Sequence, residues 1–295
     1  MIMQTTKNQH DCPRWTKDYQ RLTKSDHHIE CMAAFGHCNR KENDPPLVKH
    51  IHLNCLEVTI MLKGTQVFEV DGKKYDLLGN QIFVTLPNVP HSSAGVPQLQ
   101  AEFYYFQINL LDYTSILGLD TQNTRYLINE LMKIREHVFK GNKAINALAT
   151  NAFQNLSTRD QNLRCCAQAQ IVSLLYMLCD IVHHPEPVTV TPFVVEVTKH
   201  IQRNLMKDIS LEDLSKDFGY SLSYFKAKFR AEAGITPMHY INVEKIELAK
   251  QLLLQNKSVT ETAMLLSFNS SNYFSTLFRR FTSYTPSEYQ KLFSK

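Results

Sequence analysis

Four residues in the first third of the chain have the types and the spacing of a metal or ligand site. His50, His52 and Glu57 follow one another as His-x-His-x4-Glu, and His91 comes later, directly after Pro90. Three imidazoles and one carboxylate form a donor set that a divalent transition metal accepts. If His50 and His52 lie on one extended strand, their side chains point to the same side. The chemistry open to these residues is metal binding or the polar lining of a ligand pocket.

The order His-x-His-x4-Glu-x6-Gly, completed by Gly64, resembles the motif of cupin barrels, which implies a small β-barrel. A metal-dependent dioxygenase or isomerase fused to a further domain is one alternative that this resemblance leaves open. The segment Pro87 to Pro90 departs from metal-binding cupins, because it lacks the usual Gly and is one residue short before His91. We expect this shift to turn His91 away from the other two histidines. The sequence therefore favours a ligand pocket, with no metal, no cofactor and no enzyme activity.

The residues expected to line this pocket are polar or aromatic and lie on the predicted strands. They are His37, Arg40, His50, His52, Glu57, His91 and Tyr104, with Tyr105 as the alternative to Tyr104. Such a lining suits a sugar and equally a small acid, so the identity of the small-molecule effector stays open. The alternative metal site would consist of His50, His52, Glu57 and His91.

A second set of residues repeats along the last hundred positions at a period of 49. Tyr224-Phe225 recurs as Tyr273-Phe274, and Thr236-Pro237 recurs as Thr285-Pro286. Several matches at one offset indicate a duplicated structural unit. The alternative without a nucleic-acid partner is a six-helix bundle whose aromatic stripes are simply core.

Each copy has the pattern of two helices joined by a tight turn. In the first copy, Ser210 and Ser221 are helix caps and Gly219 supplies the turn. The second copy runs from Ser258 to Leu266, turns at 267–269 and continues as a helix from Ser270. The residues expected to face the two cores are Leu222, Phe225, Phe229, Phe274, Phe278 and Phe281.

The opposite faces of the two second helices carry hydroxyl, amide and basic side chains, which suit contacts with base edges and phosphates in a major groove. The residues expected to contact DNA are Ser223, Lys226, Ala227, Arg230, Ser271, Asn272, Ser275, Thr276 and Arg279. A predicted helix from Met238 to about Gln255 separates the copies by ~27 Å, so that they can enter successive major grooves. From Phe193 to Lys295 there are 14 Lys and Arg against 10 Asp and Glu, which accounts for the whole net charge of +4.

The second copy, Asn272 to Phe281 followed by Thr285 to Tyr289, resembles the signature of the AraC/XylS family of bacterial regulators. The resemblance covers about Ile209 to Leu292. It implies two helix-turn-helix motifs on a shared linker helix, binding to promoter DNA, and in most members activation of transcription, with RNA polymerase as a partner. The chain has Ser267 and Ser283 where the family usually has Gly, and Lys245 where it commonly has Arg.

The elements that must position these residues fall into two groups. From about Ile29 to Ile108, short runs rich in β-branched and aromatic residues predict strands, with turns at Gly64, Asp71-Gly72 and Gly79. From about Thr121 to His184 the spacing becomes helical, including Leu127, Leu131, Ile134 and Val138.

We therefore expect a two-domain α+β protein. The predicted parts are a cupin-like effector-binding β-barrel (1–120), a helical dimerisation segment (121–184), a proline-rich linker (185–192) and an all-α DNA-binding domain with two helix-turn-helix motifs (193–295). The helix over 162–183 has an apolar face that would pair with a second copy or pack on its own barrel, and we expect a homodimer. The face comprises Ile171, Leu174, Leu175, Leu178, Ile181 and Val182. A barrel that only dimerises a constitutive DNA-binding protein is a further alternative.

The sequence also indicates where the protein works. The apolar run from Ile171 to Val182 is shorter than the ~20 residues of a membrane span, and Asp180 interrupts it. The start of the chain is polar, unlike a signal peptide. The chain has seven cysteines without CxxC spacing, which favours reduced thiols over a disulfide framework. These features predict a cytoplasmic protein without a membrane partner.

Overall fold

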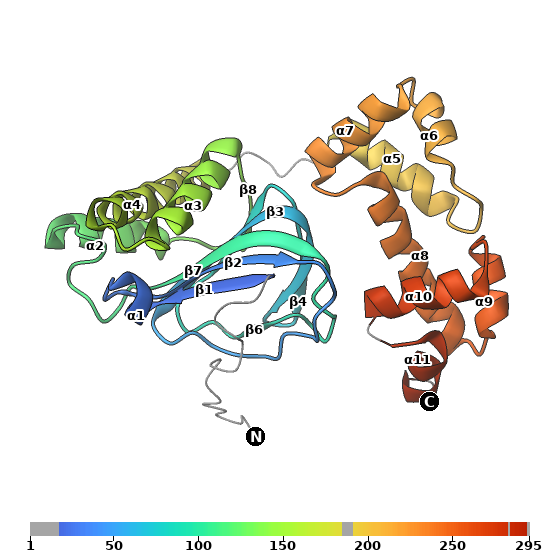
Figure 1. The fold of residues 1–295 in the computed structure, drawn as a ribbon, viewed down its shortest axis with the longest axis horizontal. Coiled ribbons are helices and arrows are strands. Elements are labelled where there is room, and N and C mark those ends of the chain that lie inside the picture. The colour runs from blue at the N-terminus through green and yellow to red at the C-terminus, as the bar shows by residue number, and fades with distance from the viewer. Residues whose placement is uncertain (1–17, 185–190, 283, 294–295) are drawn as a thin grey trace.

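The computed structural model describes residues 18–184, 191–282 and 284–293 (Figure 1). In its N-terminal part, an antiparallel sheet has the strand order β1-β2-β7-β3-β5-β8, with β4 and β6 paired to β3. The strands are β1 Tyr19–Thr23, β2 Met32–Arg40, β3 Cys55–Val70, β4 Lys73–Leu78, β5 Gln81–Thr85, β6 His91–Ser92, β7 Ala101–Asn109 and β8 Val138–Lys140. The expected barrel-like antiparallel domain is confirmed.

Side-chain alternation along the strands gives the sheet two different faces. One face packs against helices in a single core, and Phe35 of β2, for example, meets the ring of Phe153 edge-on at 5.5 Å. The other face closes around a second core that includes Met61, Phe103 and Tyr105. The helices of this domain are α1 Lys24–His27, α2 Thr121–Leu131, α3 Lys143–Leu156 and α4 Gln161–His183, and the last three lie together beside the sheet in Figure 1.

The Asp71-Gly72 hairpin is confirmed, but the turn predicted at Gly64 is wrong. Asp71 and Gly72 have φ values of 50° and 78°, as a two-residue turn with positive φ requires. Gly64 instead lies within the long strand β3, next to a register shift between Met61 and Lys63. A Cβ on Gly64 would come within 2.4 Å of the backbone oxygen of Gln100, the residue before β7, so glycine permits the close approach of the two chain segments here.

The helix predicted through Val138 is also wrong. The helix α2 ends at Leu131, and Val138 begins β8, where Phe139 pairs with Ile82 of β5. Leu131 and Ile134 are buried as expected, but in different backbone conformations. Apolar residues three and four apart satisfied the helical pattern here, whereas strand pairing decided the structure.

The apolar face of α4 is largely used within its own chain. Four of its six residues, Ile171, Leu174, Leu175 and Leu178, are buried in the core shared with the sheet, and Ile181 and Val182 pack against it partly buried. This face is therefore not free to form the expected helix pair with a second copy. The helix α4 is long and apolar enough to cross a membrane by length and composition, in contrast to the shorter run considered above, although its core-facing side is buried.

The C-terminal part consists of helices that form two small cores on either side of α8. The helices are α5 Pro192–Arg203, α6 Leu211–Asp217, α7 Leu222–Ala233, α8 Pro237–Leu254, α9 Val259–Leu265, α10 Ser271–Thr282 and α11 Pro286–Phe293. One core contains Phe225 and Phe229, and the other contains Phe274 and Phe278. Both helix-turn-helix units and the helix between them are confirmed.

The predicted linker lies mostly outside the described residues, which resume at Thr191. The Thr191 hydroxyl caps α5, and Pro192 is the first residue of that helix. Ser283, where the family usually has Gly, also lies outside the described residues.

The turn of the second unit places a serine in a conformation that favours glycine. Ser267 has a φ of 51°, and the equivalent residue of the first unit is Gly219 with a φ of 72°. A left-handed L-residue costs about 1–2 kcal/mol, while the hydroxyl of Ser267 donates to the Met206 carbonyl at 2.8 Å. We expect Ser267→Ala to be about 1 kcal/mol less stable than Ser267→Gly in urea unfolding, because both variants lose the hydroxyl bond and only alanine keeps the strain of the left-handed conformation. Equal stability of the two variants would argue against strain at this turn.

Because His27 is buried, we expect the barrel to lose stability in mild acid. His27 is 2% exposed, its Nδ1 accepts from the Ile29 N–H, and burial lowers its pKa to about 4. Because the unfolded pKa is about 6.5, the unfolded chain binds more protons between these values, so stability falls as the pH drops through this window. The loss reaches about 3 kcal/mol at most. Urea unfolding at pH 7.5 and at pH 5 measures this loss as the difference between the two free energies of unfolding. The His27→Gln variant should show a smaller difference than the parent. An unchanged difference would exclude His27 as the cause.

Candidate functional site

The recognition helix of the first unit presents four of the expected residues on its outer side. Ser223, Lys226, Ala227 and Arg230 are all exposed, whereas Phe225 and Phe229 are fully buried. The expected core residue Leu222 is partly buried. The four outward residues line a cavity of about 640 Å³ together with Leu211, Thr236, Pro237 and Met238. The helix begins at the Ser221 cap, so the cap and the aromatic spacing together set which side faces outward.

The recognition helix of the second unit repeats this arrangement. Phe274, Phe278 and Phe281 are buried, which leaves the polar residues on the opposite side. Asn272, Thr276 and Arg279 are exposed, and Ser271 and Ser275 are half-buried. The hydroxyl of Ser270 caps the helix by accepting from the Tyr273 N–H at 3.1 Å. All nine expected DNA-contacting residues therefore lie at least partly exposed on two equivalent helices.

Two exposed aromatic residues belong to the same surfaces but were not among the expected contacts. Tyr224 and Tyr273 are 54% and 53% exposed, and they occupy equivalent positions in the two units. The repeat itself was the signal, since both tyrosines recur at its period. A ring exposed beside basic and amide side chains can pack on sugars or phosphates as those residues hydrogen-bond.

Lys245, where the family commonly has Arg, is a structural residue of the second unit. It is 6% exposed, its Nζ donates to the Leu266 carbonyl at 2.7 Å, and it lies 5.2 Å from the Phe268 ring centroid. Burial lowers the pKa of Lys245. The lysine satisfies a carbonyl at the end of α9 and so holds the turn before α10 in place.

One end of α10 faces the barrel domain. Thr276, Arg279 and Arg280 line a cavity of about 620 Å³, and the barrel contributes Lys41, Glu42, Asn43 and Gln100 to its wall. Arg280 donates to the Gln100 side chain. In this arrangement, part of the second surface that is expected to contact DNA lies against a loop of the barrel.

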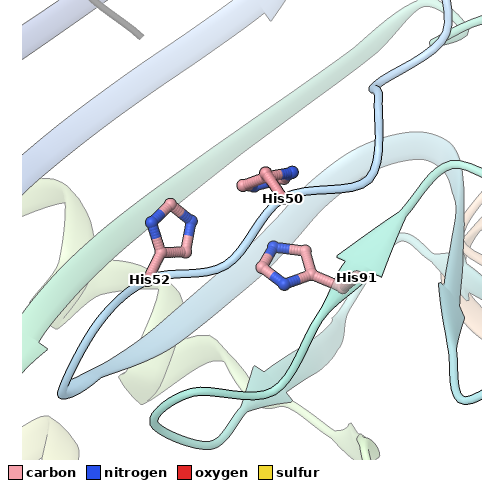
Figure 2. Close-up of side chains that lie close together, drawn as sticks. All are labelled: His50, His52 and His91. Carbon is pink, nitrogen blue, oxygen red and sulfur yellow. The ribbon is translucent and has the colours of Figure 1, made fainter. Parts of the chain in front are cut away.

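Three of the barrel histidines converge inside the sheet. His50 and His91 exchange two backbone hydrogen bonds of 3.0 Å, which place their rings 4.2 Å apart. One ring nitrogen from each of His50, His52 and His91 lies within 4.8 Å of the others (Figure 2). The prediction that His91 turns away is wrong, because its pairing with His50 aims the ring inward. The prediction of a strand through His50 and His52 is wrong as well, since only His50 forms a bridge and His52 lies in the loop before β3.

Glu57 of β3 sits among these rings. Its carboxylate lies 2.9 Å from Nε2 of His52 and 3.4 Å from Nε2 of His91, and it accepts from Gln107. Burial alone would raise the pKa of Glu57, but its contacts with the two histidines hold the pKa well below the usual value. Burial lowers the pKa of His50 to about 4. The cluster is thus a buried carboxylate surrounded by imidazoles.

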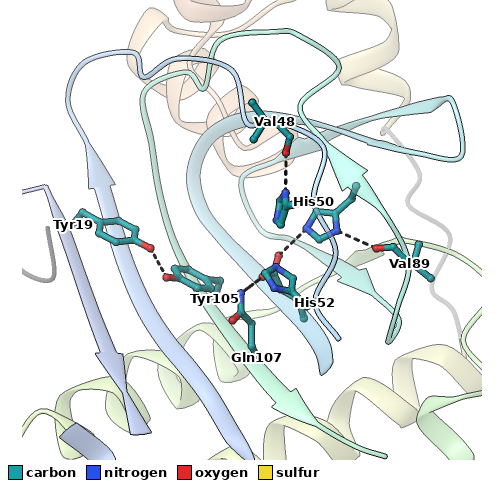
Figure 3. A network of polar contacts seen from close by, with 9 residues as sticks. Tyr19, Val48, His50, His52, Val89, Tyr105 and Gln107 are labelled. Carbon is teal, nitrogen blue, oxygen red and sulfur yellow. Dashed lines mark hydrogen bonds and ion pairs between the residues drawn. The ribbon is translucent and has the colours of Figure 1, made fainter. Parts of the chain in front are cut away.

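The structure separates other residues expected in the same pocket. His37 and Tyr104 stack at 4.5 Å on the helix-facing side of the sheet, where both rings also meet Phe153. Tyr105 lies on the inner face and hydrogen-bonds Tyr19, while Gln107, which was not expected, contacts both Glu57 and His52 (Figure 3).

Arg40 lies on the inner face but is engaged in a network of its own. Its guanidinium donates to Asp44, Gln66, Gln98 and the carbonyl of Leu99. Its donors are thus bound within the protein rather than aimed at the histidine cluster.

Comparison with known proteins places both parts in described families. Residues 47–178 match the AraC-like ligand binding domain, and residues 214–292 match a helix-turn-helix domain. An uncharacterized HTH-type transcriptional regulator in the cgkA 5' region of Pseudoalteromonas carrageenovora is 40% identical over 95 residues, which cover 32% of this chain and 57% of the relative. The probable transcriptional regulator LumQ of Photobacterium leiognathi is 36% identical over 97 residues, 32% of this chain and 39% of the relative.

The similarity to these relatives spans less than two thirds of either one's length. Among solved structures, the C-terminal domain of AraT, a response regulator from Geobacillus stearothermophilus, is 26% identical. That match covers 35% of this chain and 87% of the other, with a TM-score of 0.34.

Proposed function

Because the chain belongs to the AraC-type transcriptional regulators, with an AraC-like ligand-binding domain and a helix-turn-helix domain, we propose that it regulates a promoter by binding DNA through α7 and α10. The observation that carries the proposal is the pair of equivalent helices, each with an aromatic core side and a polar, basic outer side. The 18-residue helix α8 separates the units by ~27 Å, a spacing that suits successive major grooves.

The residues proposed to contact DNA divide by chemistry. Lys226, Arg230 and Arg279 supply charge for phosphates or for the O6 and N7 atoms of guanine. Asn272 and the hydroxyl side chains suit base edges and backbone oxygens. Ala227 allows close approach of α7 to the groove or to a thymine methyl.

The barrel is proposed to bind a small-molecule effector, such as a sugar or a small acid, and to carry out no catalysis. His50, His52, Glu57 and His91, with Tyr105 and Gln107 beside them, form a polar group on its inner face, in which Glu57 and His91 are buried. The loop at Lys41 to Asn43, which precedes His50 along the chain, lines the cavity beside Arg279. A ligand that binds one arrangement of this loop more tightly would shift how the second unit meets DNA.

The remaining parts of the proposal concern assembly and location. We propose a cytoplasmic homodimer that activates transcription through contact with RNA polymerase. Because the inner face of α4 is buried, a second copy would have to use its outer side, where Leu163 is 38% exposed, or the neighbouring Tyr126, which is 57% exposed.

Selection of bound fragments from a random DNA library by the full-length chain tests this proposal. Recovery of one shared sequence, bound with an affinity that falls steeply with salt, is expected for specific binding with several phosphate contacts. Recovery of no shared sequence would reject sequence-specific regulation. Repeating the selected-site titration with added sugars and small acids tests the effector part, for which a change in affinity is expected.

A further inference from the structure

The turn between α9 and α10 touches the first helix-turn-helix unit directly, at a point away from the axis of α8. We propose that the hydroxyl of Ser267 couples the two units and thereby determines which spacing of two DNA half-sites the chain accepts. This role deepens the proposed binding of DNA by α7 and α10, on which it rests. Ser267 is a positioning residue, because it acts through the relative orientation of the units and not through a contact with DNA.

The acceptor of the coupling bond is fixed to the first unit. The hydroxyl of Ser267 donates to the Met206 carbonyl at 2.8 Å, across 61 positions of the chain, where the loop after α5 reaches the turn beside α9 (Figure 1). Leu205 anchors this loop in the first core, in which it is 9% exposed. The Lys207 N–H donates to the Asn204 carbonyl at 2.8 Å. The Met206 carbonyl is therefore held between a buried side chain and a closed turn.

The donor of the bond is fixed to the second unit by the end of α9. The Ser267 N–H donates to the Met264 carbonyl at 3.0 Å, and the Phe268 N–H donates to the Ala263 carbonyl at 2.9 Å. This pair of bonds ends a helix with one left-handed residue, a position that glycine occupies without strain. The first unit forms the same turn with Gly219, so the turn itself does not require a serine. Strain that persists in a structure points to a role of the strained residue, and here that role is the bond to the first unit.

A buried lysine of α8 connects the same two segments. Lys245 donates from Nζ to the carbonyl of Leu266, the residue before Ser267, and so supports the turn from the side of α8. Burial lowers the pKa of Lys245, and the charge of Asp208, two residues after Met206, opposes this effect. The opposite charges of Asp208 and Lys245 attract the loop of the first unit toward the turn of the second unit.

A second connection away from α8 restricts how the units move. Leu248 of α8 packs against both cores, so this helix links the two units. Units that are joined through one element can still make small hinge movements about it. The bond from Ser267 to Met206 opposes such movements, because they stretch it. One extra base pair between two half-sites shifts the second half-site by about 3.4 Å and turns it by about 35°. Binding to such a site requires the units to move.

Double electron–electron resonance without DNA tests the coupling, because it measures the distribution of distances between the units. The spin labels are attached to the full-length chain through Lys216→Cys on α6 and Thr260→Cys on α9, at two exposed positions. Cys165 and Cys166 are exposed, and Cys12 lies outside the described residues, so these three are first replaced by serine. We expect one narrow distribution of distances in this parent.

Ser267→Ala and Ser267→Gly should both broaden the distribution, because both lose the hydroxyl. Met206→Ala is the matched control, since it removes an exposed side chain at the other end of the bond and keeps the carbonyl. It should leave the distribution as narrow as in the parent. Broadening in Ser267→Ala alone would assign the effect to backbone strain and overturn the proposal. No broadening in either Ser267 variant would overturn it as well.

A titration of the selected DNA site with one base pair inserted between its half-sites tests the effect on specificity. The parent should lose affinity on insertion, and both Ser267 variants should lose about 3- to 10-fold less, the equivalent of one hydrogen bond. Equal losses in the parent and the variants would overturn the role in spacing. If the chain selects no DNA site, the proposed function fails, while the distance distribution still decides whether Ser267 couples the units.

Discussion

Arg230→Ala and Arg279→Ala should each weaken binding to the selected DNA site by about 1–3 kcal/mol, or about 5- to 150-fold. Each arginine is exposed on the outer side of its recognition helix, and neither forms an ion pair among the described residues. A contact with phosphate would weaken binding to all sequences and reduce the salt dependence, whereas a contact with guanine would relax specificity at one position. Because the two residues lie on separate units, the free-energy changes of the double variant should nearly add.

Arg125→Ala provides the control, since Arg125 is equally exposed but lies on α2 of the barrel domain. It should leave the affinity unchanged in the same fluorescence anisotropy titration. If Arg279→Ala bound DNA like the parent while Arg230→Ala did not, the outer side assigned to α10 would be wrong.

Phe278→Ala should unfold the second helix-turn-helix unit while leaving the first largely intact. Phe278 is 0% exposed, and replacing a buried phenylalanine by alanine costs about 3–5 kcal/mol. Its core is separate from the one around its repeat partner Phe229, and α8 lies between them. Hydrogen exchange followed by mass spectrometry should therefore show loss of protection over α9 to α11 but not over α6 and α7.

Phe229→Ala is the mirror experiment and should expose α6 and α7 instead. Tyr273→Ala is the control, because Tyr273 is 53% exposed. It should change the free energy of hydrogen-exchange protection by less than about 0.5 kcal/mol. Equal loss of protection across both units in either phenylalanine variant would mean that the DNA-binding domain unfolds as one cooperative body.

The DNA-binding domain could be predicted from the sequence because its signals are local. Ser210 and Ser221 cap helices where predicted, and the aromatic residues recur at helical spacing in both copies. Caps and helical periodicity depend on residues within one or two turns, so the printed sequence contains them. The orientation of the nine outward residues followed directly from that periodicity.

The barrel was less predictable because its pairings join distant segments. The strand β8 pairs with β5 across more than fifty residues, which the helical spacing around Val138 did not reveal. The inward aim of His91 likewise depends on its backbone pairing with His50, forty-one positions earlier. Spacing along one segment carries no information about such partners.

Some of the pocket could still have been resolved from the sequence. His37 and Arg40 lie three apart on β2, so a regular strand directs them to opposite faces. The same alternation separates Tyr104 from Tyr105 on β7. Which of the two faces is the inside of the barrel is decided only by the packing of α3 and α4 on the other one.

A DNase I footprint of the full-length chain on its selected site tests the central claim most directly, because it reports where both units contact DNA at once. We predict two protected segments about one helical turn apart, on one face of the duplex, with the second segment lost in Phe278→Ala. A single protected segment that both Arg230→Ala and Arg279→Ala diminish alike would contradict the claim that α7 and α10 read separate grooves.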